Sequence, residues 1–258
     1  MTEATVTHND GPSYDRFMGS WSRTAGAIFL KWLAPPKGVR WLDVGCGTGV
    51  FTDLVLRRCM PLAIDGLDSQ ASQIEWAIGQ HRSGRVTFRT GDAHHLPFAD
   101  GIYDVISSAL VLNFLSDRLK ALREMRRVAR SGAIVAAYLW DFADERTPNS
   151  SLCLGLRQLG IDVPRPPGIT LPHLIDSFRL ASYRDIMTET FDVTVAFDSF
   201  EAFWQSQTPS FSPVSTTIAA LPLSEKAKLV EIVRQLCVGK DGAPSWSARA
   251  HAIRARVP

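Results

Sequence analysis

Segments rich in apolar residues alternate with segments of helical periodicity over the first 140 residues. Five short segments are typical of strands, at residues 39–44, 61–67, 85–89, 103–110 and 133–140. The fourth is apolar nearly throughout, as a strand covered on both faces should be. Between them, apolar residues recur at helical spacing over residues 50–58, 69–81 and the stretch after Ser116. This alternation predicts an α/β protein with a doubly wound parallel sheet and right-handed crossovers.

Capping and breaking residues predict where these helices begin and end. An aromatic-rich helix over residues 14–33 is expected to stop at the breaker Pro35-Pro36-Lys37-Gly38. Ser69 and Ser116 are hydroxyl residues in front of helical segments, so each is predicted to be an N-cap. Ser131-Gly132 is predicted to end the helix that follows Ser116.

The pattern changes after Trp140. Residues 185–198 alternate between apolar and polar side chains, which predicts a half-exposed strand near a sheet edge. Residues 245–256 are expected to supply a last strand. Helices are predicted at residues 150–159 and over most of residues 199–239, with a rigid proline-rich loop at 163–168. The clearest of these helices starts at Ser224, and its expected buried stripe is Leu229, Ile232, Val233 and Leu236.

Composition places the chain among ordinary globular proteins. Apolar residues make up 45% and charged residues 21% of 258 residues, and the net charge of +2 is too small to indicate a nucleic-acid or membrane partner. No apolar run approaches the roughly 20 residues that span a bilayer, and residues 1–10 lack the pattern of a secretory signal. The four cysteines are scattered without a C-x-x-C pair, which fits a reducing cytoplasm.

Two polar groupings have simple interpretations. His94 and His95 are adjacent, and no Cys or carboxylate completes a ligand set at usable spacing, so no metal site is expected. A basic run on the helix after Ser116 is expected to be a solvated face opposite an apolar one. It comprises Arg118, Lys120, Arg123, Arg126, Arg127 and Arg130.

The most informative segment is a glycine-rich turn directly after the first predicted strand. Gly45, Gly47 and Gly49 alternate with other residues, and glycine lets a backbone approach a ligand where a Cβ would collide. A ligand at this position lies by the N-terminus of the next helix. Asp43 precedes the turn, and Val50 stands where a dinucleotide fingerprint has its glycine.

These residues resemble a known family. The segment Asp43–Gly49 resembles motif I of the class I S-adenosylmethionine-dependent methyltransferases, the loop that wraps the methionine part of the cofactor. Gly66-Leu67-Asp68 resembles the strand end whose acidic residue binds both ribose hydroxyls. Gly91-Asp92-Ala93 resembles the adenine-contact loop, and Tyr103–Ser108 resembles the family's fourth strand. The resemblance covers about residues 39–140 and is greatest to the ubiquinone/menaquinone-type, small-molecule branch.

The resemblance implies a doubly wound, mostly parallel seven-stranded sheet of the Rossmann-like methyltransferase type with a helical lid or cap. It implies a lid-helix region at residues 1–38, a cofactor-binding core at 39–145, and a substrate-side variable region with the last strands at 146–258. It also implies S-adenosylmethionine as cofactor and S-adenosylhomocysteine as product. The expected cofactor-binding residues are Asp43, Gly45, Cys46, Gly47, Gly49, Asp68, Ser69, Asp92, Ala93 and Ser108.

The acceptor site is less clearly marked. Asn113-Phe114 stands where many relatives carry a histidine pair or His-Trp, which argues against a histidine base there. His173 and Tyr14 are the candidates for a catalytic residue, although a lone histidine more often belongs to plain surface or core. The residues expected to bind the acceptor are Tyr14, Arg16, Trp21, Asn113, Trp140 and Trp204, although such aromatic residues are as often core.

The predicted activity is methyl transfer to an O, N or C atom of a small molecule by in-line displacement. Proximity and water exclusion supply most of the catalysis, so an obvious catalytic group is not required. A nucleic-acid base is not the expected acceptor, because Ser108-Ala109-Leu110-Val111 replaces the Asn-Pro-Pro-Tyr type of signature. The alternatives are a non-methylating cofactor-binding protein and an NAD-dependent oxidoreductase. A cytoplasmic monomer or homodimer is expected.

Overall fold

A seven-stranded sheet organises the chain. The computed structural model describes residues 11–81, 83–163, 168–209, 212–239 and 242–258, with side chains from Arg16 onwards. The strands are β1 (Arg40–Val44), β2 (Ala63–Asp68), β3 (Val86–Thr90), β4 (Tyr103–Ala109), β5 (Ala129–Trp140), β6 (Arg184–Ala196) and β7 (Ser245–Arg256). Their order is β3-β2-β1-β4-β5-β7-β6, and β7 is antiparallel to both its neighbours. The predicted doubly wound, mostly parallel sheet is confirmed.

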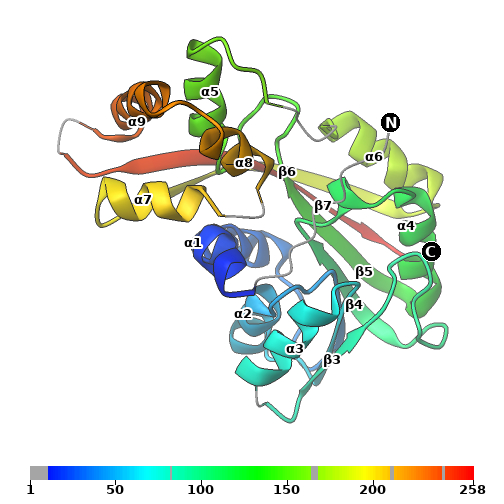
Figure 1. Cartoon of the computed structure of the whole chain (residues 1–258). Helices are drawn as coiled ribbons and strands as arrows, with labels where there is room; N and C mark the ends of the chain where they lie inside the picture. The colour runs from blue at the N-terminus through cyan, green and yellow to red at the C-terminus, as the bar shows by residue number, and fades with distance from the viewer. Residues whose placement is uncertain (1–10, 82, 164–167, 210–211, 240–241) are drawn as a thin grey trace.

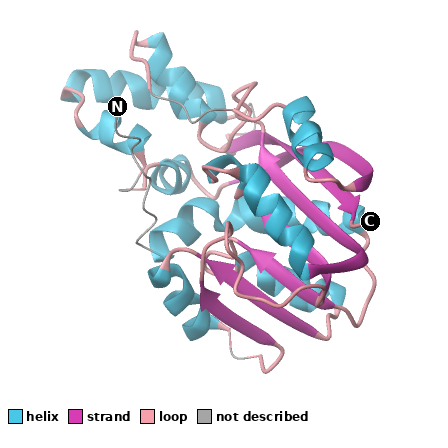
Figure 2. Ribbon diagram, turned by 90° about the vertical axis from the view of Figure 1, so that its right-hand side faces the viewer, coloured by secondary structure: helices cyan, strands magenta, loops and turns pink. Residues whose placement is uncertain are grey.

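Helices cover both faces of this sheet (Figures 1 and 2). On one side lie α1 (Gly11–Leu33), α2 (Val50–Cys59) and α3 (Ala71–Gln80), and on the other α4 (Arg118–Val128) and α6 (Leu171–Leu180). The burial of β5 follows this arrangement, since its side chains alternate between the two layers. Tyr138 and Trp140 pack with α1, whereas Val135, Ala137 and Leu139 pack with α4 and α6.

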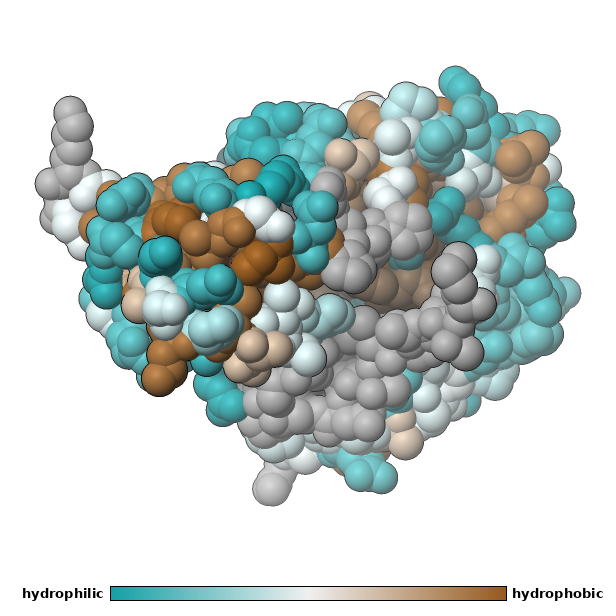
Figure 3. All heavy atoms as spheres, turned by 45° about the horizontal axis from the view of Figure 1, so that its top comes forward, coloured by the Kyte–Doolittle hydropathy of each residue, from teal (hydrophilic) through white to brown (hydrophobic). Residues whose placement is uncertain are grey.

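A separate lobe lies at one end of the β6–β7 ribbon. It contains α5 (Ser150–Gln158), α7 (Phe200–Gln207), α8 (Pro213–Ala219) and α9 (Leu223–Cys237). These helices share a small apolar core, which includes Leu152, Phe203 and Leu229. Figure 3 shows apolar side chains reaching the surface among hydrophilic ones on the left, where this lobe lies. The edge strand predicted over residues 185–198 is β6, and the last predicted strand is β7.

Three predicted boundaries are wrong, each for a local reason. The N-cap of α3 is Gln70 and not Ser69, because Asp68 accepts the Gln70 N–H and holds the chain extended for one residue longer. The N-cap of α4 is Asp117 and not Ser116, since the Asp117 carboxylate accepts the Lys120 N–H. A carboxylate next to a serine is an equally good N-cap, so the sequence did not distinguish the two.

The Ser131-Gly132 pair lies inside a strand. The helix α4 already ends at Val128, and β5 runs on from Ala129 through the pair. Gly132 has φ +77°, and the β4–β5 pairing jumps in register beside it, so this glycine marks a bulge and not a helix end.

The buried stripe of α9 also differs from the prediction. It runs through Leu229, Val233 and Cys237 at a spacing of four, and leaves Leu236 37% exposed. The proline-rich loop predicted at 163–168 falls largely on residues 164–167, outside the described residues.

Candidate functional site

The glycine turn is joined directly to the end of the neighbouring strand. The N–H groups of Gly45 and Cys46 donate to the Leu67 carbonyl at 2.7 and 3.0 Å. The Gly47 N–H donates to Asp68 Oδ2 at 2.9 Å, and the other Asp68 oxygen accepts the Gln70 N–H. The structure therefore brings the turn and Asp68 together, at the carboxyl edge of β1 and β2.

Gly45 and Gly47 differ in what surrounds the position of the missing Cβ. Gly45 and Gly47 have φ values of +78° and +53°, which other residues rarely adopt. A Cβ on Gly45 would also stand 2.3 Å from Val111 Cγ2, whereas one on Gly47 would meet only Gln73 Oε1, at 3.5 Å. Gly45 is thus fixed by packing inside the protein, while Gly47 leaves open space above the turn for a ligand.

Asp43 lies in the protein interior, just before the turn. Its carboxylate is fully buried and accepts hydrogen bonds from Thr52 Oγ1 at 2.7 Å and Ser107 Oγ at 3.0 Å. Burial raises its pKa from 3.8 to about 6, although both hydrogen bonds oppose this. Asp43 therefore ties β1 to β4 and α2, and its position is that of a support for the turn. Direct binding of the cofactor by Asp43 stays a prediction.

The buried Asp43 carboxyl is expected to make the folded state less stable, not more stable, as the pH rises through the acidic range. Because the folded pKa lies above the unfolded one, the folded state binds more protons between them, and stability falls as pH rises from about 4 to about 6. Asparagine does not titrate, so in Asp43→Asn we expect the decrease in the free energy of unfolding over this pH range to be smaller by up to about 3 kcal/mol. Urea unfolding at pH 4, 5, 6 and 7 measures it, with Asp104→Asn as the surface control. Parallel pH profiles for Asp43→Asn and the wild type would contradict the assignment.

The loop after β3 carries Asp92, whose carboxylate turns toward its own loop. Asp92 Oδ1 accepts from the backbone N–H of His94 and lies 2.7 Å from His94 Nδ1, and Oδ2 lies 3.5 Å from His95 Nδ1. The His94 backbone N–H lowers the pKa of Asp92, so this exposed carboxyl is ionised at neutral pH. Ala93 is buried in the core beside it. Among the described residues, the partners of the Asp92 carboxylate belong to its own loop, so its adenine-binding role stays a prediction.

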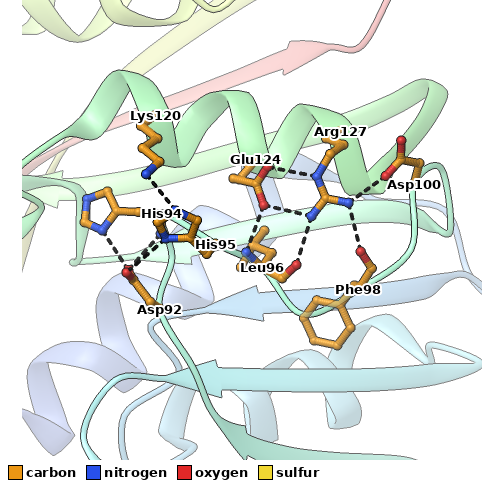
Figure 4. A network of polar contacts seen from close by, with 9 residues as sticks. All are labelled: Asp92, His94, His95, Leu96, Phe98, Asp100, Lys120, Glu124 and Arg127. Carbon is orange, nitrogen blue, oxygen red and sulfur yellow. Dashed lines mark hydrogen bonds and ion pairs between the residues drawn. The ribbon is translucent and has the colours of Figure 1, made fainter.

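Arg127 fixes this loop against α4 (Figure 4). Its guanidinium donates to the carbonyls of Leu96 and Phe98 and pairs with Glu124 and Asp100. Glu124 in turn accepts the Leu96 N–H at 2.9 Å. Arg130, predicted on the same helix, lies in β5, because α4 ends at Val128. The part of the basic run on α4 is more than the predicted solvated face, because Arg127 holds the loop that begins at Asp92.

Arg127→Met is expected to loosen that loop while leaving α4 folded. Methionine keeps much of the alkyl stem but makes none of the five hydrogen bonds, so hydrogen exchange of the Leu96 amide should quicken at least tenfold. Mass-detected exchange on wild type and variant measures this. Arg130→Met, which removes only an exposed pair with Asp104, is the matched control. Equal protection of the Leu96 amide from exchange in the two variants would show that Arg127 does not hold the loop.

A narrow cleft opens beside the glycine turn. It measures about 40 Å³, and its lining joins α1, the turn, the end of β4 and β5. The lining residues are Ser22, Gly45, Cys46, Gly47, Thr48, Val50, Phe51, Ala109, Leu110 and Tyr138. Sites that bury a nucleoside-sized ligand are typically several hundred Å³. The cleft must therefore widen for such a ligand, and α1 is the element that covers it.

The predicted acceptor residues are placed in different surroundings. Trp21 and Trp140 are buried, 0% and 4% exposed, in edge-to-face contact with centroids 6.0 Å apart. Asn113 is buried beyond the end of β4, in the single turn η1 (Leu112–Phe114). Trp204 packs on Phe200 within the lobe. Trp21 and Trp140 are close in sequence to the cleft-lining residues Ser22 and Tyr138, and Trp204 packs against the separate lobe core.

The remaining candidates are Ser108, which is buried, and residues that lie on the surface or outside the described side chains. His173 is exposed at the start of α6, where its Nδ1 lies 3.0 Å from Thr170 Oγ1. Arg16 is exposed on α1. The side chain of Tyr14 lies outside the described residues. Ser69 is exposed next to Asp68, and Ser108 is buried near the end of β4. Their predicted roles stay predictions.

The sequence did not predict the residues that hold Asp43 and pack against Gly45. Thr52 and Ser107 hold Asp43, and Val111 packs beneath Gly45. Ser107 lies in the strand that resembled the family's fourth, but nothing in one sequence separates it from Ser108. Only the strand register, which places Ser107 opposite Asp43, selects it.

Among the residues whose positions are described, no group of three His, Cys, Asp or Glu side chains could hold a metal ion. No described helix is both long and apolar enough to cross a membrane. Burial raises the pKa of the Cys46 thiol, so the cysteine within the turn is a neutral thiol.

Comparison with known proteins identifies relatives of this chain. Residues 42–137 match the family model described as a methyltransferase domain. A demethylmenaquinone methyltransferase of Roseiflexus sp. (strain RS-1) is 38% identical over 135 residues, 48% of this chain and 54% of the relative. The O-methyltransferase rstn1 of Aspergillus nomiae is 34% identical over 161 residues, 60% of this chain and 70% of the relative. The chain spans about half the length of the curated relatives matched most strongly.

A solved structure supports the fold alone. The phosphoethanolamine N-methyltransferase 2 of Haemonchus contortus, in complex with S-adenosyl-L-methionine, superimposes with a TM-score of 0.62 at 16% identity. The match covers 99% of this chain and 58% of that one. Its sheet and the one described above are therefore of the same architecture.

Proposed function

This chain belongs to the class I S-adenosylmethionine-dependent methyltransferases, and from that membership we propose that it transfers a methyl group to a small molecule. The proposed reaction is an in-line displacement at the methyl carbon by an O, N or C atom of the acceptor. The family's cofactor is S-adenosylmethionine, and the product left by the transfer is S-adenosylhomocysteine.

The observation that carries the proposal is the contact between Asp68 and the glycine turn. A left-handed glycine turn and a carboxylate from the next strand meet at one edge, joined by the 2.9 Å bond from Gly47 N–H to Asp68 Oδ2. A carboxylate oxygen accepts more than one hydrogen bond, as a ribose diol requires. The open space above Gly47 and the N-terminus of α2 complete a cradle for a nucleoside.

The chain's own residues supply position and enclosure. When bound, S-adenosylmethionine supplies a methyl group on a positively charged sulfur. Gly45, Gly47 and Asp68 would hold it, with Asp43 fixing the turn from below. The helix α1 contributes Ser22 to the wall of the cleft and is proposed to exclude water from the bound ligand. Asp92 and Ala93 are proposed to border the adenine, and Ser69 and Ser108 to flank the nucleoside.

The direct test is product formation. The purified chain is incubated with S-adenosylmethionine and pools of phenols, amines, carboxylic acids and activated methylene compounds, and products are sought by mass spectrometry. Methylated products heavier by one methylene, formed in step with S-adenosylhomocysteine, are expected. Tight cofactor binding with no methylated product from any pool would contradict methyl transfer and leave a binding protein.

The setting of this activity is part of the same proposal. We take the acceptor to be a small molecule and not a nucleic acid, and the protein to act as a cytoplasmic monomer or homodimer. The regions 1–38 and 146–258 are proposed to select the acceptor, with 39–145 binding the cofactor. Size-exclusion chromatography with light scattering distinguishes monomer from dimer.

A further inference from the structure

Two buried indole groups lack a hydrogen-bond acceptor at one end of the cleft. The Nε1 atoms of Trp21 and Trp140 are inaccessible to solvent and have no partner among the described residues. An indole N–H can only donate. Buried polar groups in native proteins nearly always find partners, so a pair in contact without one calls for an explanation.

The position of this pair follows from how α1 crosses β5. Phe29 packs on Tyr138 with centroids 4.8 Å apart, and Trp21, two turns earlier on α1, packs on Trp140, two residues later on β5. The helix therefore runs opposite to the strand, and its first half lies over the carboxyl end of β5. Tyr138 and Ser22, the neighbours of the pair on each element, both line the cleft. Neither indole is itself in the lining, so the pair lies next to the proposed site, behind these two lining residues.

The described residues at the same edge include further buried polar atoms without hydrogen-bond partners. Two of them are Ser108 Oγ, near the end of β4, and Asn113 Oδ1, on the turn that follows. The side chains of Ser108 and Asn113 are 1% and 8% exposed. Four elements therefore place unpartnered polar atoms around one edge of the sheet, which is the arrangement of a ligand-binding site and not of a dry core.

We propose that the Nε1–H groups of Trp21 and Trp140 bind an oxygen atom of the methyl acceptor. Both indole N–H groups can only donate a hydrogen bond, so the ligand atom that binds them must accept. The ligand therefore presents a carbonyl, carboxylate or hydroxyl oxygen. The surrounding rings of Phe51, Tyr138 and the two indoles favour a flat, largely apolar body behind that oxygen. The acceptor class is an oxygenated aromatic or conjugated compound. This inference rests on the proposed function, because it places the acceptor beside the cofactor turn.

Indole N–H resonances provide a test that does not depend on knowing the natural acceptor. The chain has seven tryptophans, whose Nε1–H signals are assigned by single Trp→Phe variants. The full-length protein saturated with S-adenosylhomocysteine is titrated with 2-naphthol, 2-naphthoate and 2-acetylnaphthalene, and with naphthalene as the same ring without oxygen. We expect at least one oxygenated probe to move the Trp21 and Trp140 signals downfield, and naphthalene to move neither downfield.

Variants test the same contact by affinity. Trp140→Phe and Trp21→Phe should each weaken binding of the responding probe about fivefold or more, the loss expected for one hydrogen bond. The affinity for naphthalene should stay within about twofold of the wild-type value. Trp32→Phe is the matched control, because Trp32 lies at the opposite end of α1 against Arg254. It should change neither affinity.

The outcomes separate this inference from the proposed function. Downfield shifts confined to oxygenated probes support it, and equal effects of all four compounds, or no effect of any, overturn it. A chain that binds S-adenosylhomocysteine and methylates a product while both indole signals stay fixed disproves only the acceptor contact. A chain that fails to bind S-adenosylhomocysteine disproves the proposed function itself.

Discussion

Replacing Gly45 by alanine is expected to lower the free energy of unfolding by about 2–6 kcal/mol. The backbone at Gly45 has φ +78°, and a left-handed residue with a side chain costs about 1–3 kcal/mol. The added Cβ would also stand 2.3 Å from Val111 Cγ2 and 3.0 Å from its Cβ, so Val111 must move, and overpacking adds about 1–3 kcal/mol. Urea unfolding of wild type and variant measures the loss.

The chain offers controls that divide this loss into its two causes. Gly38 has φ +70° with open space around its missing Cβ, so Gly38→Ala should show the backbone strain alone. Val111→Ala removes both methyl groups that meet the new Cβ, so the double variant Gly45→Ala/Val111→Ala should recover the packing part. Equal losses for Gly38→Ala and Gly45→Ala, with no coupling to Val111, would show that the turn is not fixed by packing.

Replacing Asp68 by asparagine is expected to weaken S-adenosylmethionine binding by about 5- to 150-fold, or about 1–3 kcal/mol. The substitution keeps one oxygen for the Gly47 or Gln70 N–H but removes the charge and half of the accepting capacity. Isothermal titration calorimetry with S-adenosylmethionine measures the change. We expect Asp68→Ala to lose at least as much, because it also frees the Gly47 N–H.

The control for Asp68 lies on the same strand. Asp65 accepts from the Tyr103 hydroxyl at 2.8 Å and lies earlier in β2, away from the turn. Asp65→Asn should leave cofactor affinity unchanged within twofold. If Asp68→Asn also binds as tightly as the wild type, Asp68 does not hold the ribose and the proposed cradle is wrong.

The sequence was sufficient for the fold because periodicity and breakers agree along the core. The apolar run of β4 and the alternation over β6 reflect burial on two faces and on one, and the structure has both as expected. Boundaries were harder to predict, since competing caps stand side by side. Ser116 and Asp117 are equally suited to begin α4, and only the Asp117 bond to the Lys120 N–H decides between them.

The site could be predicted only where a motif is contiguous. The glycine turn and Asp68 lie at successive strand ends, so their meeting follows from a parallel sheet. The partners of Asp43 do not follow, because Thr52 and Ser107 reach it from α2 and β4 through the register of three elements. Trp21 and Trp140 are 119 positions apart, and their contact depends on the path of α1 over β5.

A crystal structure of the chain with S-adenosylhomocysteine would show whether the glycine turn and Asp68 hold the cofactor. We expect the ribose hydroxyls within hydrogen-bond distance of Asp68, the amino-acid part against Gly45 and Gly47, and α1 displaced from the narrow cleft. A nucleoside bound elsewhere, with the Asp68 carboxylate out of contact with it, would contradict this arrangement.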